Sequence, residues 1–162
     1  MSDKKIKIGL DFHGVLATNP DYFANFCRQV IAKGWELHII SGGPRKDISE
    51  YLALRKIPYT KLYTILEVCE KEGTVRFFED GSFYVKAEIW DKAKGEYCRK
   101  HKINLHIDDS ASYEQYFSTP FCLYKQHKGK CVIGKENYAI RFTDGIGPAL
   151  QKIEKFINES EM

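Results

Sequence analysis

Acidic side chains follow two apolar segments of this sequence, and a hydroxyl side chain ends a third. The acids are Asp11 and the pair Asp108-Asp109, and the hydroxyl belongs to Ser41. Each lies at the end of a run typical of a buried strand. The carboxyl ends of parallel strands meet at one edge of a sheet, where open α/β proteins bind their ligands. These segments therefore predict one active site assembled from distant parts of the chain.

These residue types suit the chemistry of phosphate esters. The carboxylate of Asp11 can attack an electrophilic phosphorus to form an aspartyl-phosphate, which water then hydrolyses. Charge on the transferred group must be neutralised, and Mg²⁺ suits this because it prefers oxygen ligands such as those of Asp11 with Asp108 or Asp109. Ser41 and the backbone amides around Gly42 can bind phosphate oxygens. A nearby lysine would add fixed positive charge.

Strands and helices are expected to alternate along the chain. We expect strands over residues 6–11, 36–41, 59–66, 104–108 and 121–124, helices over about 20–33, 45–55, 89–101 and 146–157, and a turn at 128–130. Asn19 is a plausible N-cap before Pro20, and Gly34 marks the end of that helix. This alternation predicts the α/β class with a Rossmann-like, three-layer parallel sheet.

A β-rich segment interrupts this alternation. Residues from Thr74 to Val85 form two such runs around Asp80-Gly81, which is a strong signal of a hairpin. We interpret residues from about 70 to 88 as a small β-hairpin insertion on a single domain of residues 1–162. The hairpin either covers the active site or decorates an edge of the domain.

Composition excludes several classes of protein. The chain has 162 residues, 43% of them hydrophobic, and its net charge of +3 is too small to argue for nucleic acid binding. No apolar run is long enough to span a bilayer, and the N-terminus leads directly into a strand without a signal peptide. The five cysteines form no Cys-x-x-Cys pair, which favours reduced thiols. We therefore expect a cytoplasmic protein with no membrane partner.

Taken in order, these segments resemble the motifs of the haloacid dehalogenase-like (HAD) superfamily of hydrolases, most of which are Mg²⁺-dependent phosphatases. The segment Leu10-Asp11-Phe12-His13-Gly14-Val15 is similar to the first motif, Asp-x-Asp-Gly-Thr/Val after hydrophobic residues, except at one position. The strand ending in Ser41 resembles the second motif, and Asp108-Asp109 resembles the fourth. The third motif is an upstream lysine, for which Lys94 fits best and Lys92 is the alternative. The resemblance spans roughly residues 6–125.

The resemblance implies a role for each matched residue. Asp11 would be the nucleophile. The Mg²⁺ ligands would be the carboxylates of Asp11, Asp108 and Asp109. The backbone carbonyl of His13 would be a further ligand. Ser41 and Lys94 would hold the phosphoryl oxygens.

The chain departs from the family at His13, where family phosphatases carry an acidic general acid and base. Imidazole transfers protons near neutral pH, so His13 can retain this role, although a protonated His13 would weaken metal binding. Family branches without this acid include hydrolases of carbon–halogen or carbon–phosphorus bonds and inactive members. Three hypotheses follow: a Mg²⁺-dependent phosphohydrolase, a hydrolase of another bond, and a catalytically weak binding or regulatory protein.

The spacing of the motifs also limits how the site is covered. One expected helix occupies most of the chain between Asp11 and Ser41, which leaves no room there for a large cap domain. The resemblance therefore implies a small, capless phosphatase with an open site. Such a site fits a large phosphorylated substrate, or closure by a second subunit in a homo-oligomer.

Overall fold

A seven-stranded sheet forms the centre of the protein. The computed structural model describes residues 5–126, 129–133 and 138–160. The strands of this sheet are β1 (Lys7–Leu10), β2 (Glu36–Ser41), β3 (Lys61–Thr64), β6 (Leu105–Asp108), β7 (Phe121–Lys125), β8 (Lys130–Ile133) and β9 (Tyr138–Arg141). They lie in the order β3-β2-β1-β6-β7-β8-β9. The first five are parallel, whereas β8 and β9 are antiparallel to their neighbours.

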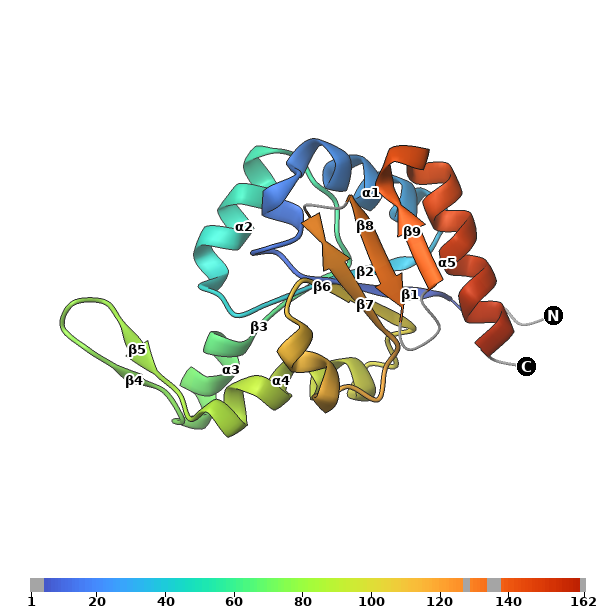
Figure 1. Cartoon of the computed structure of the whole chain (residues 1–162). Coiled ribbons are helices and arrows are strands. Elements are labelled where there is room, and N and C mark those ends of the chain that lie inside the picture. The colour runs from blue at the N-terminus through green and yellow to red at the C-terminus, as the bar shows by residue number, and fades with distance from the viewer. Residues whose placement is uncertain (1–4, 127–128, 134–137, 161–162) are drawn as a thin grey trace.

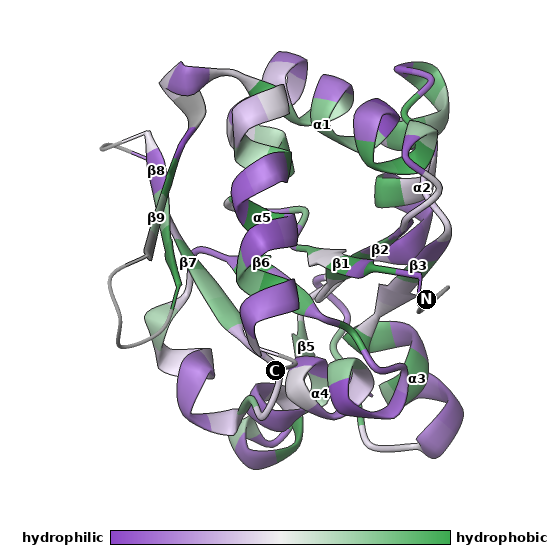
Figure 2. Ribbon diagram, turned by 90° about the vertical axis from the view of Figure 1, so that its right-hand side faces the viewer, coloured by the Kyte–Doolittle hydropathy of each residue, from purple (hydrophilic) through white to green (hydrophobic). Residues whose placement is uncertain are grey.

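Helices cover both faces of this sheet (Figure 1). One face carries α1 (Pro20–Ala32), α2 (Arg45–Leu54) and α5 (Ile146–Ser160), and the other carries α3 (Ile65–Glu72) and α4 (Ala87–Lys100). The described residues also include the short 3-10 helices η1 (Leu16–Thr18), η2 (Ala111–Tyr116) and η5 (Phe142–Asp144). Hydrophilic and hydrophobic bands alternate along α5, as expected of a helix with one buried face (Figure 2). The predicted α/β class and its mostly parallel, Rossmann-like sheet are confirmed.

Alternate residues of the central strands supply two separate cores. In β2, Leu37 and Ile39 belong to the larger core, which also contains the buried side chains of α1, α2 and α5. The next residue, Ile40, packs with Cys98 of α4 and with Ile103 on the other face. Side chains alternate between the faces of a strand, and a parallel sheet covered on both faces needs apolar residues on each. This requirement explains why apolar residues of β2 face both sides of the sheet.

The chain changes direction at β1. From β1 it runs outward through β2 to β3, and then it returns to β6 on the opposite side of β1. The carboxyl ends of β1 and β6 therefore border the crevice at which such sheets bind ligands. Asp11 directly follows β1, Asp108 is the last residue of β6, and Ser41 is the last residue of β2.

The expected elements differ from the observed ones in three places. The predicted strand to Leu66 is wrong: it ends at Thr64, and Ile65 begins α3, which buries Ile65, Leu66 and Cys69 at helical spacing. The strands β8 and β9 were not expected, and Lys130, placed in the predicted turn at 128–130, begins β8. Residues 127–128 lie outside the described chain. The other predicted strands and helices are confirmed within a few residues at each end.

The predicted hairpin is confirmed between α3 and α4. Its strands, β4 (Arg76–Phe77) and β5 (Phe83–Tyr84), are antiparallel, with Phe77 opposite Phe83. Gly81 has a φ of +89° in the connecting turn, a conformation that glycine adopts without strain. The hairpin projects from the body of the molecule beyond α3 (Figure 1).

Two further observations concern the composition. Cys27, Cys69, Cys98, Cys122 and Cys131 are all buried free thiols. Among the described residues, no helix combines the length and the apolar character that crossing a membrane requires.

Candidate active site

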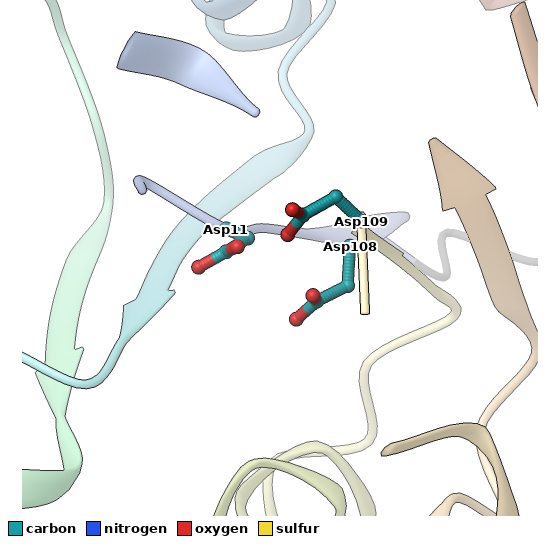
Figure 3. Close-up of side chains that lie close together, drawn as sticks. All are labelled: Asp11, Asp108 and Asp109. Carbon is teal, nitrogen blue, oxygen red and sulfur yellow. The ribbon is translucent and has the colours of Figure 1, made fainter. Parts of the chain in front are cut away.

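Three carboxylates converge at the carboxyl edge of the sheet (Figure 3). Asp11, Asp108 and Asp109 each offer an oxygen atom, and these atoms all lie within 4.8 Å of one another. Asp11 and Asp108 are buried, whereas Asp109 is exposed. The structure thus brings together the acids that follow β1 and β6. Such a set of oxygen donors suits a hard divalent cation such as Mg²⁺.

Lys94 bridges the two buried carboxylates from α4. Its Nζ donates hydrogen bonds to Asp11 Oδ1 at 3.0 Å and to Asp108 Oδ2 at 2.8 Å. The neighbouring Gly95 lets α4 approach η2, because a Cβ at Gly95 would overlap the backbone carbonyl of Tyr116. This close packing brings the lysine to the edge of the sheet.

Lys92, the alternative for this position, lies elsewhere. Its side chain is 47% exposed and pairs with Glu88 on the surface of α4, with 3.8 Å between Nζ and Oε1. Lys94 is buried in the same helix. The geometry therefore favours Lys94 as the lysine of the site.

Asp108 holds this lysine in place. Its Oδ2 also receives a hydrogen bond from His106 Nε2 at 2.9 Å, and its Oδ1 accepts the Ser110 backbone N–H at 3.1 Å. Burial lowers the pKa of His106, so its imidazole is neutral and donates through Nε2. Burial opposes ionisation of Asp108, but the hydrogen bond from His106 and the charge of Lys94 outweigh it and lower the pKa of Asp108. Both Asp108 oxygens are thus occupied, which leaves Asp11 and Asp109 as the freer donors for a cation.

The cluster carries an excess of negative charge. Burial raises the pKa of Asp11 well above its ordinary value, and Asp108 and Asp109 add to this effect, while Lys94 opposes it. Burial also disfavours the charged form of Lys94, but the two buried carboxylates outweigh burial and raise the pKa of Lys94. One fixed positive charge therefore faces three acids. A divalent cation would balance them and favour the ionised form of Asp11.

The turn after β1 makes room for Asp109. Gly14 has a φ of +88°, and a Cβ at this position would overlap the carboxylate of Asp109. Only glycine both adopts this backbone conformation readily and leaves that space open. The Asp-x-x-Gly spacing of Asp11 and Gly14 thus has a direct structural reason.

Ser41 presents an unpaired hydroxyl to the site. Its side chain is fully buried, and Oγ has no hydrogen-bond partner within the described structure. Leaving a buried donor unpaired costs about 1–3 kcal/mol, a cost that a ligand oxygen would remove. Ser41 lines a cavity of about 370 Å³ whose other walls include Asp11, His13, Gly14, Gly42, Gly43, Phe83, Trp90, Lys94, Asp109, Ser110 and Tyr113. The sequence-predicted residues other than Asp108 therefore share one cavity, and Asp108 contacts it through Lys94.

His13 is one of the residues around the cavity. It lines the cavity and is exposed, and its ring packs edge-on against Phe12 with 4.9 Å between the ring centroids. It can therefore reach bulk water and a bound ligand. Its acid–base role and the metal-binding role of its backbone carbonyl stay predictions.

The sequence analysis did not name three aromatic residues of this cavity. Phe83 comes from the hairpin, Trp90 from α4 and Tyr113 from η2. Trp90 lies one helical turn before Lys94, so both project from the same face of α4. That spacing was a signal available in the sequence. Because Phe83 lines the cavity, the hairpin contributes to the site and is more than an edge decoration.

Comparisons with known proteins do not assign the chain to a family. No family model, curated protein or solved structure matches it. What the fold and the site define is an α/β protein with a mostly parallel sheet and an acidic, lysine-bridged cavity at the point where the chain changes direction. The function is therefore argued from the geometry of this cavity.

Proposed function

We propose that this protein is a Mg²⁺-dependent phosphohydrolase of the HAD type that cleaves a phosphate monoester through an aspartyl-phosphate. One observation carries the proposal: the unpaired hydroxyl of Ser41 lines the same cavity as the buried Lys94–Asp11 ion pair. A nucleophilic carboxylate, a fixed cation and a free hydroxyl donor are the groups that phosphoryl transfer needs.

The residues present fit a magnesium ion. Asp11 and Asp109 would hold it with the backbone carbonyl of His13, and Gly14 leaves the space that Asp109 needs. When bound, Mg²⁺ would neutralise charge on the phosphoryl group and orient it. The excess of carboxylates over lysine at this site supports a divalent cation over a monovalent one.

The first half of the reaction uses Asp11 as nucleophile. Lys94 donates a hydrogen bond to Oδ1 of this carboxylate and so restrains its orientation. A carboxylate oxygen forms a bond to phosphorus while the bond from phosphorus to the ester oxygen breaks. His13 supplies the proton that the departing alcohol takes up, and Ser41 and Lys94 donate hydrogen bonds to the phosphoryl oxygens.

The second half restores the enzyme. A water molecule attacks the phosphorus of the aspartyl-phosphate, His13 accepts its proton, and inorganic phosphate leaves with the carboxylate of Asp11 regenerated. The balance is one ester and one water consumed, with one alcohol and one phosphate released. His13 thus acts as the acid in the first half and the base in the second.

Turnover of a panel of phosphate esters, with and without Mg²⁺, tests this proposal. We expect Mg²⁺-dependent release of phosphate, a loss of at least a thousandfold in Asp11→Asn, and no loss in Asp47→Asn on the exposed side of α2. Acid quenching of the wild type with radiolabelled ester should trap label on the protein, and Asp11→Asn should trap none. Wild-type activity in Asp11→Asn would exclude the covalent mechanism. Ester binding without turnover would favour a binding protein instead.

A further inference from the structure

Aromatic side chains form a row that leads out of the active-site cavity. The Trp90 indole N–H donates to the Tyr113 hydroxyl at 3.2 Å. The rings of Trp90 and Phe83 lie 5.5 Å apart at an interplanar angle of 34°, and those of Phe83 and Phe77 lie 6.4 Å apart. The row therefore joins η2, α4 and both hairpin strands, from the cavity to the surface. We call Tyr113, Trp90 and Phe83, which line the cavity, the aromatic wall.

The aromatic wall begins beside the groups that would hold a phosphate. A Cβ at Gly42 would lie 2.7 Å from Trp90 Cζ2, so the indole packs directly on the backbone that follows Ser41. On the other side, Lys94 Nζ lies 5.1 Å from the centre of the Tyr113 ring. The cavity thus has a charged end and an aromatic end in direct contact. A ligand with a phosphate at one end would place its organic part against the rings.

The chemistry of this wall favours a flat, apolar partner. Phe83 has no polar atom, and the only N–H of the Trp90 side chain is already donated to the Tyr113 hydroxyl, so the wall offers mainly ring faces to a ligand. Phe83 is 40% exposed although it lines the cavity, and an aromatic ring gains most when another flat ring covers it. The cavity volume of about 370 Å³ lies within the range of small-ligand sites, roughly 300–1,000 Å³.

We propose that the aromatic wall stacks on a planar aromatic ring of the substrate, so that the esters bound here are phosphate monoesters carrying such a ring. A nucleoside 5′-monophosphate and free O-phosphotyrosine both have this chemistry. The inference rests on the proposed function for the phosphate end of the ligand. It goes further by naming the class of the organic part and Phe83 as a specificity-determining residue.

Binding to the Asp11→Asn protein in Mg²⁺ tests the inference without turnover. The probes for calorimetric titration are adenosine 5′-monophosphate, O-phosphotyrosine and glycerol 3-phosphate. At least one of the two aromatic esters should bind about tenfold or more tightly than glycerol 3-phosphate, and which one binds better identifies the source of the ring. Adding Phe83→Ala should weaken that ester about tenfold and leave glycerol 3-phosphate unchanged.

Tyr84→Ala is the matched control. Successive residues of a strand point to opposite faces, and Tyr84 is 58% exposed and does not line the cavity, so this variant should bind like its parent. Three outcomes would each overturn the inference. They are equal affinity for all three probes, absence of binding by both aromatic esters, and the same effect of Phe83→Ala and Tyr84→Ala. Turnover by the wild type separates this inference from the proposed function. If all esters are cleaved equally, the phosphohydrolase proposal holds and the inference fails. If aromatic esters bind but are not cleaved, the inference about the ring holds and the phosphohydrolase proposal fails.

Discussion

Gly14 and Asp109 lie so close together that a methyl group on Gly14 would overlap the carboxylate of Asp109. The turn after β1 and the end of β6, which are far apart in the sequence, are thus in direct contact. Because the Asp109 carboxylate occupies the space beside this glycine, the proposed metal site depends on a residue that would not contribute a side-chain ligand.

The substitution Gly14→Ala should therefore abolish the stabilisation of the protein by Mg²⁺. A cation at 100 times its dissociation constant adds about 2.7 kcal/mol to the free energy of unfolding. Gly34→Ala is a matched control, because Gly34 has a similar φ of +81° but no atom within 4 Å of an added Cβ. Thermal unfolding with and without Mg²⁺ should show the rise in Tm in Gly34→Ala and the wild type only. An equal rise in Gly14→Ala would place the cation elsewhere.

Lys94→Met should destabilise the protein by about 3–5 kcal/mol at neutral pH, because it leaves two buried carboxylates without their shared cation. Without the lysine, the pKa of Asp11 rises further, and a group whose pKa is raised on folding stabilises the fold less as pH increases. The loss should therefore be smaller at pH 5 than at pH 7. Urea unfolding measures it, and Lys92→Met on the exposed face of α4 should change little at either pH.

The sequence predicts the acids of the site better than its lysine. Asp11 and Asp108 end apolar runs, and strand ends meet at the edge of a parallel sheet whatever the packing of the helices. Lys94 and Lys92 lie on the same helix two residues apart, and the face of α4 that packs against η2, next to Gly95, is the one that carries the buried lysine. That contact is a property of tertiary packing, which local sequence does not encode.

The errors in the fold have the same origin. Ile65 and Leu66 continue the apolar character of β3, and over so few residues an apolar run fits a strand or a helix equally well. Packing of α3 against α4 selects the helix. The strands β8 and β9 are short, and they extend the sheet through antiparallel pairing of β8 with β7 and of β9 with β8. Their alternation alone was too brief to indicate a strand.

Ser41→Ala should weaken inorganic phosphate binding about tenfold or more, because a hydrogen bond to a charged group contributes about 1.5–3 kcal/mol. The free energy of unfolding should stay the same or rise, since the hydroxyl has no partner in the described structure to lose. Calorimetric titration with phosphate in the presence of Mg²⁺ tests the expected loss of binding. Urea unfolding tests the expected stability. Ser49→Ala on α2 is the control. A large loss of stability in Ser41→Ala would show that the hydroxyl has a structural role.

His38 should make folding stability depend on pH. Burial lowers the pKa of His38, so the neutral imidazole donates through Nε2 to Glu36 at 2.8 Å and accepts from Tyr97 at Nδ1 at 2.7 Å. The unfolded chain takes up a proton at His38 near pH 6.5 that the folded chain resists, so stability falls as pH drops below this value. His38→Gln should reduce the slope of unfolding free energy between pH 7.5 and 5.5 by at most about 1.4 kcal/mol per pH unit, the limit for one proton. An unchanged slope would contradict the neutral assignment.

The departure at His13 gives the sharpest test of the catalytic mechanism. An alkyl alcohol leaves phosphorus poorly unless an acid protonates its oxygen, whereas an activated aryl alcohol leaves without help. His13→Ala should therefore lower kcat for an alkyl phosphate by about 10²–10⁴-fold, the usual contribution of general acid–base catalysis, and slow formation of the aspartyl-phosphate from an aryl phosphate much less. His13→Asp introduces the acidic group found in the phosphatases that the sequence resembles, and it should recover turnover of the alkyl phosphate. Rapid-quench measurement of the labelled protein separates the two half-reactions.

Equal rates for wild type and His13→Ala with the alkyl ester would show that His13 only spaces Asp11 from Gly14. Activity that appears only in His13→Asp would instead mark the natural protein as one that binds phosphate esters without cleaving them.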